Sequence, residues 1–92
     1  MIYINTPRNY TFRKKPIRSA HLISDIPGKE GTRELTRFAV KIGLKRRWMS
    51  KYGKSDEHFD VMNTFIDKAL KTGARQIDKY KFANIIKKKR GE

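Results

Sequence analysis

The chain contains no cysteine, which excludes disulfide bonds and metal sites built from thiolates. Acidic residues are also scarce, with 9 Asp plus Glu against 23 Lys plus Arg and a formal net charge of +14. No apolar run approaches the roughly 20 residues that a membrane-spanning helix requires. The opening MIYIN lacks the charged-then-apolar layout of a signal peptide. We therefore expect a cytoplasmic protein with no membrane partner.

The positive charge is spread along the whole chain. Residues 1–24 carry five basic and no acidic residues, residues 25–57 nine basic and five acidic, and residues 58–92 nine basic and four acidic. A domain that is basic throughout repels itself, which is typical of proteins with a polyanionic partner. We expect that partner to be nucleic acid, either DNA or RNA, or a nucleic-acid-containing particle. Solubility, or an acidic protein partner, is the alternative explanation.

The hydrophobic pattern predicts an α/β fold: a small single domain over residues 1–92, with a short mixed or partly parallel sheet packed by about three helices. Strands are predicted over residues 1–5, 19–24 and 74–77, and RRWMS is a further candidate. Apolar residues at helical spacing predict one helix from Thr32 to Gly43, one ending at Gly73, and one capped by Asp78. The second helix starts after either Asp60 or Ser55, since both residue types favour caps.

Three polar segments separate or follow these elements. Residues 6–18 are basic and contain two prolines, so we expect a loop or arm there. Residues 25–32, DIPGKEGT, are expected to form a turn or loop, and residues 87–92 a basic tail.

Five motifs resemble a family of small bacterial and phage proteins catalogued only as a domain of unknown function. They are MIYIN.P at the start, HLISD at 21–25, FAVKIGLKRRWM at 38–49, HFD at 58–60 and A...GA..I at 69–77. The resemblance covers nearly the full length and implies one domain with a shared site, but it brings no mechanism. It also implies a phage or bacterial origin, and host cytoplasm if a phage encodes the chain. The chain departs from the pattern at PGKEG, which resembles an insertion, and in its stronger positive charge.

Both histidines lie near an aspartate, so four residues are candidates for catalysis: His21, Asp25, His58 and Asp60. Side chains alternate along a strand, which puts His21 and Asp25 on one side, and His58 and Asp60 on one side if HFD is extended. At the carboxyl edge of a parallel sheet such a set would bind phosphate, or cleave a phosphodiester with a divalent ion held by both aspartates.

Structural roles are the alternative for three of these residues: Asp60 as a helix cap, Asp25 as a turn residue, His21 as a packed side chain. Their spacing matches no established ligand pattern. No metal ligand is therefore assigned, and the cofactor is left open.

Nine basic residues are the candidate phosphate contacts. Arg13, Lys14 and Lys15 stand beside aromatic residues that would stack on bases or pin the arm to the core. Arg46 and Arg47 offer the bidentate fork that suits phosphate, with the adjacent Trp48 expected in the core. The remaining four are Lys87, Lys88, Lys89 and Arg90 at the end of the last helix.

Three functions fit these observations. The first is a small nucleic-acid-binding protein that contacts phosphates through dispersed Lys and Arg, and this is the function we predict. The second is a metal-assisted nuclease or nucleotide-processing enzyme. The third is a phage inhibitor that docks on an acidic host protein. The sequence leaves open the choice between DNA and RNA, the strandedness, any catalysis and the oligomeric state.

Overall fold

One long strand organises the sheet. The computed structural model describes residues 1–91 and contains β1 (Ile2–Asn5), β2 (Arg8–Phe12), β3 (Lys15–Ser24), α1 (Gly28–Lys41), the 3₁₀ helix η1 (Arg46–Trp48), β4 (Phe59–Met62), α2 (Thr64–Thr72), β5 (Arg75–Ile77) and α3 (Lys79–Lys89). β3 pairs antiparallel with β1, β2 and β4, and β5 joins the far side of β1 in parallel. The expected α/β fold with a mixed sheet and three helices is confirmed.

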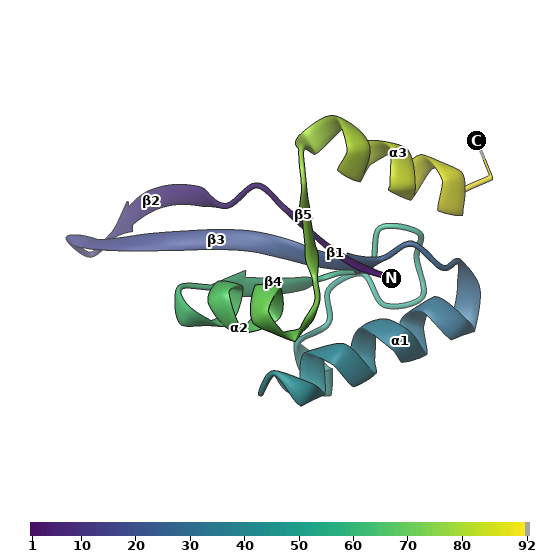
Figure 1. Ribbon diagram of the computed structural model, residues 1–92, viewed down its shortest axis with the longest axis horizontal. Coiled ribbons are helices and arrows are strands. Elements are labelled where there is room, and N and C mark those ends of the chain that lie inside the picture. The colour runs from purple at the N-terminus through teal and green to yellow at the C-terminus, as the bar shows by residue number, and fades with distance from the viewer. Residues whose placement is uncertain (92) are drawn as a thin grey trace.

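The helices lie on both faces of the sheet, with α1 and α2 on one face and α3 on the other (Figure 1). The main core lies on the α1–α2 face, where Leu22, Phe59 and Val61 of the sheet meet Leu35 and Ile66 of the helices. All five side chains are at most 1% exposed. Burying a side chain of this size contributes roughly 1.5–3 kcal/mol, so this face supplies most of the stability.

Local signals correctly predict the end of α2 and the start of α3. Gly73 adopts the left-handed conformation at the C-cap of α2, and Asp78 caps α3 by accepting a hydrogen bond of 2.8 Å from the Lys81 backbone N–H. Asp60 is not a cap, because it belongs to β4 and α2 starts after Asn63. The expectation failed because pairing with β3 keeps the chain extended as far as Met62, which overrides the preference of an aspartate for a cap.

The expected loop at residues 25–32 is instead largely the first turn of α1, which starts at Gly28 rather than after Thr32. Gly31 is buried inside the helix, where an added Cβ would collide with the Ile26 carbonyl. Gly31 therefore marks a close approach between helix and loop here.

The expected loop at residues 6–18 is for the most part the β2–β3 hairpin, which projects from the body of the molecule (Figure 1). All of β2 is exposed, so this strand buries no apolar face, and the prolines and basic residues around it favoured a loop. Pro16 is tolerated within β3 because β4 pairs only with Ser19 to Leu22 on that strand.

RRWMS is not a strand, and Trp48 is not in the core. Arg46 to Trp48 form η1, and the tryptophan is 48% exposed with the Lys45 Nζ 5.8 Å from its ring centroid. Near Trp48 in the chain, it is Leu44 and Met49 that contribute to the core instead. None of the helices within residues 1–91 combines the length and apolar character that crossing a membrane demands.

Candidate functional site

Three sequence-predicted residues meet on the face of the sheet that carries α3. His21 on β3 is the direct cross-strand partner of Asp60 on β4, and directly opposed side chains of an antiparallel pair project on the same side. His58 precedes β4 in a short bridge with Ser50, two residues from Asp60. Residues two apart in extended chain share a face, so His58 joins the pair.

The three side chains are in contact. The His21 Nε2 lies 2.9 Å and the His58 Nε2 3.7 Å from the same carboxylate oxygen, Asp60 Oδ1. The two imidazole rings lie 4.3 Å apart between centroids, tilted by 33°. Each of the three residues offers one atom that could bind a metal ion, and these three atoms all lie within 4.8 Å of one another.

Neighbouring groups hold both histidines. The His58 Nδ1 is 2.9 Å from the Asp56 carbonyl, which can only accept, so Nδ1 carries the proton and Nε2 faces the cluster as a lone-pair donor. The His21 backbone N–H donates to Asn5 Oδ1 at 2.7 Å. The first contact fixes the orientation of the His58 ring, and the second fixes the backbone of β3 at His21.

Burial lowers the pKa of His21 below its ordinary value, and electrostatic interactions with His58 and Arg8 act in the same direction. Asp60 opposes them through its charge and its hydrogen bond. The net direction favours a neutral imidazole at neutral pH, the form that accepts a proton or binds a metal.

His21 also borders a hollow of about 820 Å³ between the base of the β2–β3 hairpin and the start of α3. Arg8, Tyr10, Lys79 and Tyr80 contribute to its walls. Cations and aromatic rings therefore line the same hollow as His21, which is large enough for a nucleotide-sized group.

Asp25 lies apart from this cluster. Its carboxylate accepts a hydrogen bond of 3.1 Å from the Met1 ammonium group, which also contacts Glu34 at 2.8 Å. Asp25 follows His21 by four positions, just past the end of β3, and four positions of extended chain span roughly 13 Å. A single ion held by both Asp25 and Asp60 is not compatible with this placement.

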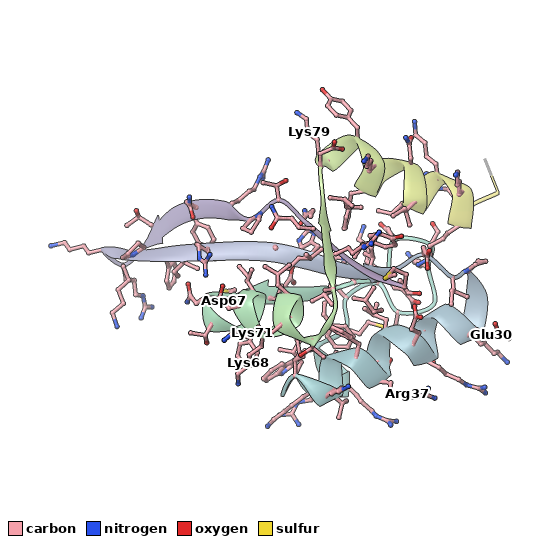
Figure 2. All side chains as sticks on the ribbon, viewed as in Figure 1. Glu30, Arg37, Asp67, Lys68, Lys71 and Lys79 are labelled. Carbon is pink, nitrogen blue, oxygen red and sulfur yellow. The ribbon has the colours of Figure 1, made fainter. Side chains whose placement is uncertain are left out.

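The arginines of η1 lie elsewhere as well. Arg46 borders a second hollow together with Arg33 and Arg37 of α1, on the opposite face of the sheet from His21. Figure 2 shows Arg37 on the outer side of α1. Arg46 therefore belongs to a separate basic surface and does not face the histidines.

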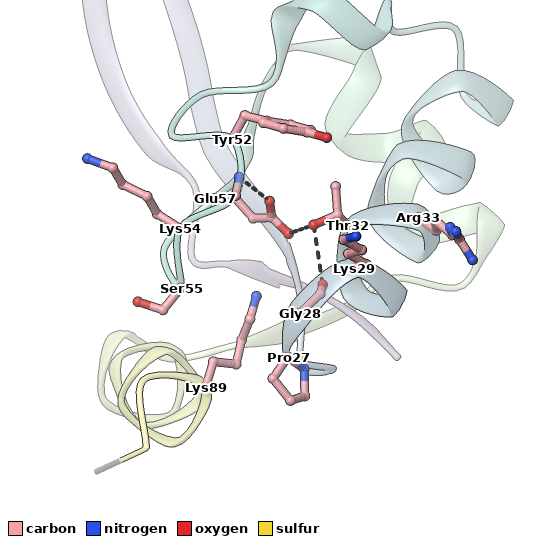
Figure 3. A pocket seen from close by; sticks show the side chains of 11 residues that line it. Pro27, Gly28, Lys29, Thr32, Arg33, Tyr52, Lys54, Ser55, Glu57 and Lys89 are labelled. Atoms are coloured by element: carbon pink, nitrogen blue, oxygen red, sulfur yellow. Dashed lines mark hydrogen bonds between the residues drawn. The ribbon is translucent and has the colours of Figure 1, made fainter.

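Lys89 belongs to a third region. It extends from α3 toward a cavity of about 520 Å³, which is also lined by the first turns of α1 and by residues 52–57 (Figure 3). Its Nζ is buried and has no hydrogen-bond partner among the described residues, and burial lowers its pKa despite the attraction of Glu57. Lys87 and Lys88 are exposed. Lys87 to Lys89 belong to α3 rather than to a tail, and Glu92 lies outside the described residues.

Sequence reasoning missed Glu57, which is 2% exposed in the same cavity. Its carboxylate accepts hydrogen bonds from the Thr32 hydroxyl at 2.6 Å and the Gly53 backbone N–H at 3.0 Å (Figure 3). A lone glutamate in a polar segment carries no periodic signal, so only the packed structure shows that it ties residues 50–58 to α1.

A family model described as "Protein of unknown function (DUF4031)" matches residues 2–89. The chain belongs to this family. No curated protein and no solved structure matches the chain. The matched residues include the hairpin, the His21–His58–Asp60 cluster and all three helices.

Proposed function

We propose that this protein binds nucleic acid, with the β2–β3 hairpin as its main contact. We call residues 8–18 the basic hairpin. They contain five basic and no acidic residues: Arg8, Arg13, Lys14, Lys15 and Arg18. A basic ribbon that projects from the body reaches phosphates that the rest of the surface cannot approach as closely.

The turn of the hairpin is the main observation that supports this proposal. Phe12 pairs with Lys15, so Arg13 and Lys14 alone form the turn, and both have positive φ, 51° and 63°. Two-residue hairpins of this kind favour Asn-Gly because ordinary side chains are strained there. Two cations occupy positions that cost backbone strain, which is a feature of sites where function decides the residue.

The flanking residues suit the same partner. Tyr10 and Phe12 on β2 are 45% and 56% exposed, and the Arg13 guanidinium carbon lies 5.3 Å from the Phe12 ring centroid. Exposed rings beside cations allow bases to stack while phosphates are neutralised, and one stacked base contributes about 1–3 kcal/mol.

A matched pair of variants tests the proposal. Lys14→Gln/Lys15→Gln and Lys68→Gln/Lys71→Gln each remove two positive charges, the second pair from the outer side of α2 (Figure 2). Binding of short fluorescent single-stranded and double-stranded oligonucleotides is measured by anisotropy over a series of salt concentrations. We expect the hairpin variant to lose roughly tenfold in affinity and to flatten the salt slope by about 1.4–1.8, whereas the α2 variant changes little.

Two results would overturn the proposal. One is an affinity of the unmodified protein that is only micromolar or weaker at low salt and insensitive to added salt. The other is an equal loss in both variants, which would show that total charge rather than the hairpin determines binding.

A further inference from the structure

We propose that His21, His58 and Asp60 form a binding site for a divalent transition metal ion, with Zn²⁺ the best-matched ion. Two imidazoles and a carboxylate are ligands that zinc accepts at about 2.0–2.2 Å. Their donor atoms already lie within 4.8 Å of one another. This inference does not depend on nucleic-acid binding.

The distances fit such an ion after small side-chain adjustments. Ligand atoms of a tetrahedral zinc site lie roughly 3.4 Å apart, as follows from bond lengths near 2.1 Å. The two nitrogen–oxygen distances are 2.9 and 3.7 Å, one shorter and one longer than this value. Rotation of the half-exposed His21 and Asp60 side chains, without movement of the strands, would equalise them.

The surroundings are those of a prepared ligand set. Metal-bound histidines typically donate a hydrogen bond from their other ring N–H to a carbonyl or carboxylate, which fixes the tautomer. The His58 Nδ1 has this contact with the Asp56 carbonyl at 2.9 Å. The side chain of His58 is only 15% exposed, so its Nε2 is held toward Asp60 rather than toward solvent.

The backbone holds the ligands as well. His21 and Asp60 are direct partners in the β3–β4 ladder, and His58 exchanges two backbone hydrogen bonds with Ser50, at 2.8 and 3.1 Å. Ligands on paired strands lose little freedom when an ion binds, which favours affinity.

Three protein ligands leave a fourth zinc position for water or a substrate oxygen, the arrangement of catalytic rather than structural zinc sites. The hollow bordered by His21, Arg8 and Lys79 adjoins the cluster. A phosphate oxygen is the chemical group that an ion and two nearby cations would share.

The competing explanation is a His–Asp hydrogen bond that only fastens β3 to β4. The two explanations differ in what happens when metal is added. A fastening pair needs no ion and gains nothing from one, whereas a ligand set gains stability that grows with the logarithm of the metal concentration once this exceeds the dissociation constant.

The test uses untagged protein freed of metal by chelation, because a histidine tag would bind zinc. Zn²⁺ alone is titrated by calorimetry, and X-ray absorption of the zinc-loaded protein counts the imidazole ligands. The chain has two histidines and no cysteine, so a site with two imidazoles must contain His21 and His58. We expect one zinc per chain, bound at micromolar concentration or tighter.

Asp60→Asn and His58→Ala should each weaken zinc binding at least tenfold, with circular dichroism confirming that each variant folds. Asp25→Asn is the matched control, since it removes the same charge from an aspartate outside the cluster, and should bind zinc unchanged. Absence of saturable binding by the unmodified protein, a zinc environment with fewer than two imidazoles, or equal losses in Asp60→Asn and Asp25→Asn would each overturn the proposal. No nucleic acid is present, so failure here leaves the hairpin proposal standing.

Discussion

The two halves of β3 lie in opposite environments. Its second half, from Ala20 to Ser24, is buried except for half-buried His21, and pairs with β1 and β4 over the core. Its first half, from Lys15, pairs with fully exposed β2 and contributes nothing to the core cluster. A two-stranded ribbon alone is marginally stable in water. The hairpin is therefore held by its continuity with the core strand, which frees its residues for contacts with a partner.

The largest expected effect is on the free energy of unfolding, and it appears when two phenylalanines are compared. Phe59 on β4 is fully buried, whereas Phe12 at the end of β2 is 56% exposed. Phe59→Ala should lower the free energy of unfolding by about 3–5 kcal/mol, because it removes a core ring and leaves a cavity. Phe12→Ala should change it by less than about 0.5 kcal/mol. Urea denaturation measures both, and similar losses would contradict the division of β3 into a core half and a ribbon half.

The next effect concerns the helix beside the buried half. Gly31 of α1 faces the Ile26 carbonyl, with the Ser24 side chain next to it. Gly31→Ala should cost about 1–3 kcal/mol, because the helix or the loop must shift to admit a methyl group. Lys29→Ala, at an exposed position of the same helix, is the control. If thermal melting shows no difference between the two, the close approach of α1 to the end of β3 is not a real constraint.

A smaller effect separates strain from charge at the tip of the hairpin. Arg13→Asn/Lys14→Gly introduces residues that accept positive φ and should raise stability by up to about 1 kcal/mol, by removing strain. The same change should weaken oligonucleotide binding. Calorimetric melting and anisotropy together check this prediction. A less stable variant would show that the two cations do not strain the turn. A variant that binds as tightly as the unmodified protein would show that these cations do not contact the nucleic acid.

The smallest effect concerns a cation at the buried end. The folded pKa of Lys89 is lowered by burial, so between that pKa and the ordinary lysine value the unfolded chain binds more protons than the folded one. Stability linked to Lys89 therefore rises with pH through this window. Lys89→Met should be slightly more stable than the unmodified protein at neutral pH, and the advantage should shrink toward pH 10. Lys88→Met, at an exposed position, should show no such trend in urea titrations at several pH values.

Much of the local structure follows from the sequence pattern. The structure contains four predicted features: the strand at MIYIN, the short strand near residue 75, the apolar stripe of α1 and the Asp78 cap. Each depends on residues within one turn or one strand, where side-chain chemistry and periodicity decide the conformation. The β2–β3 hairpin and η1 escaped prediction because neither buries an alternating face, which is the signal that patterns report.

The candidate site also shows that patterns within one segment do not predict contacts between segments. The strand alternation within HFD is visible in the sequence, and it puts His58 and Asp60 on one side. Alternation also favoured Asp25 as the partner of His21, since the two share a strand motif. The structure instead joins His21 to Asp60, which is 39 positions away along the chain.

The sequence by itself determined the strand and helix segments with clear periodicity, the excess of positive charge and the four residues able to act as acids, bases or ligands. Only the tertiary structure decided which of them meet. Residues four apart on a strand are roughly 13 Å apart, whereas directly paired residues on neighbouring strands lie about 5 Å apart. The register of β4 against β3 therefore chose Asp60 over Asp25, and that register depends on burying Phe59 and Val61 together with Leu22.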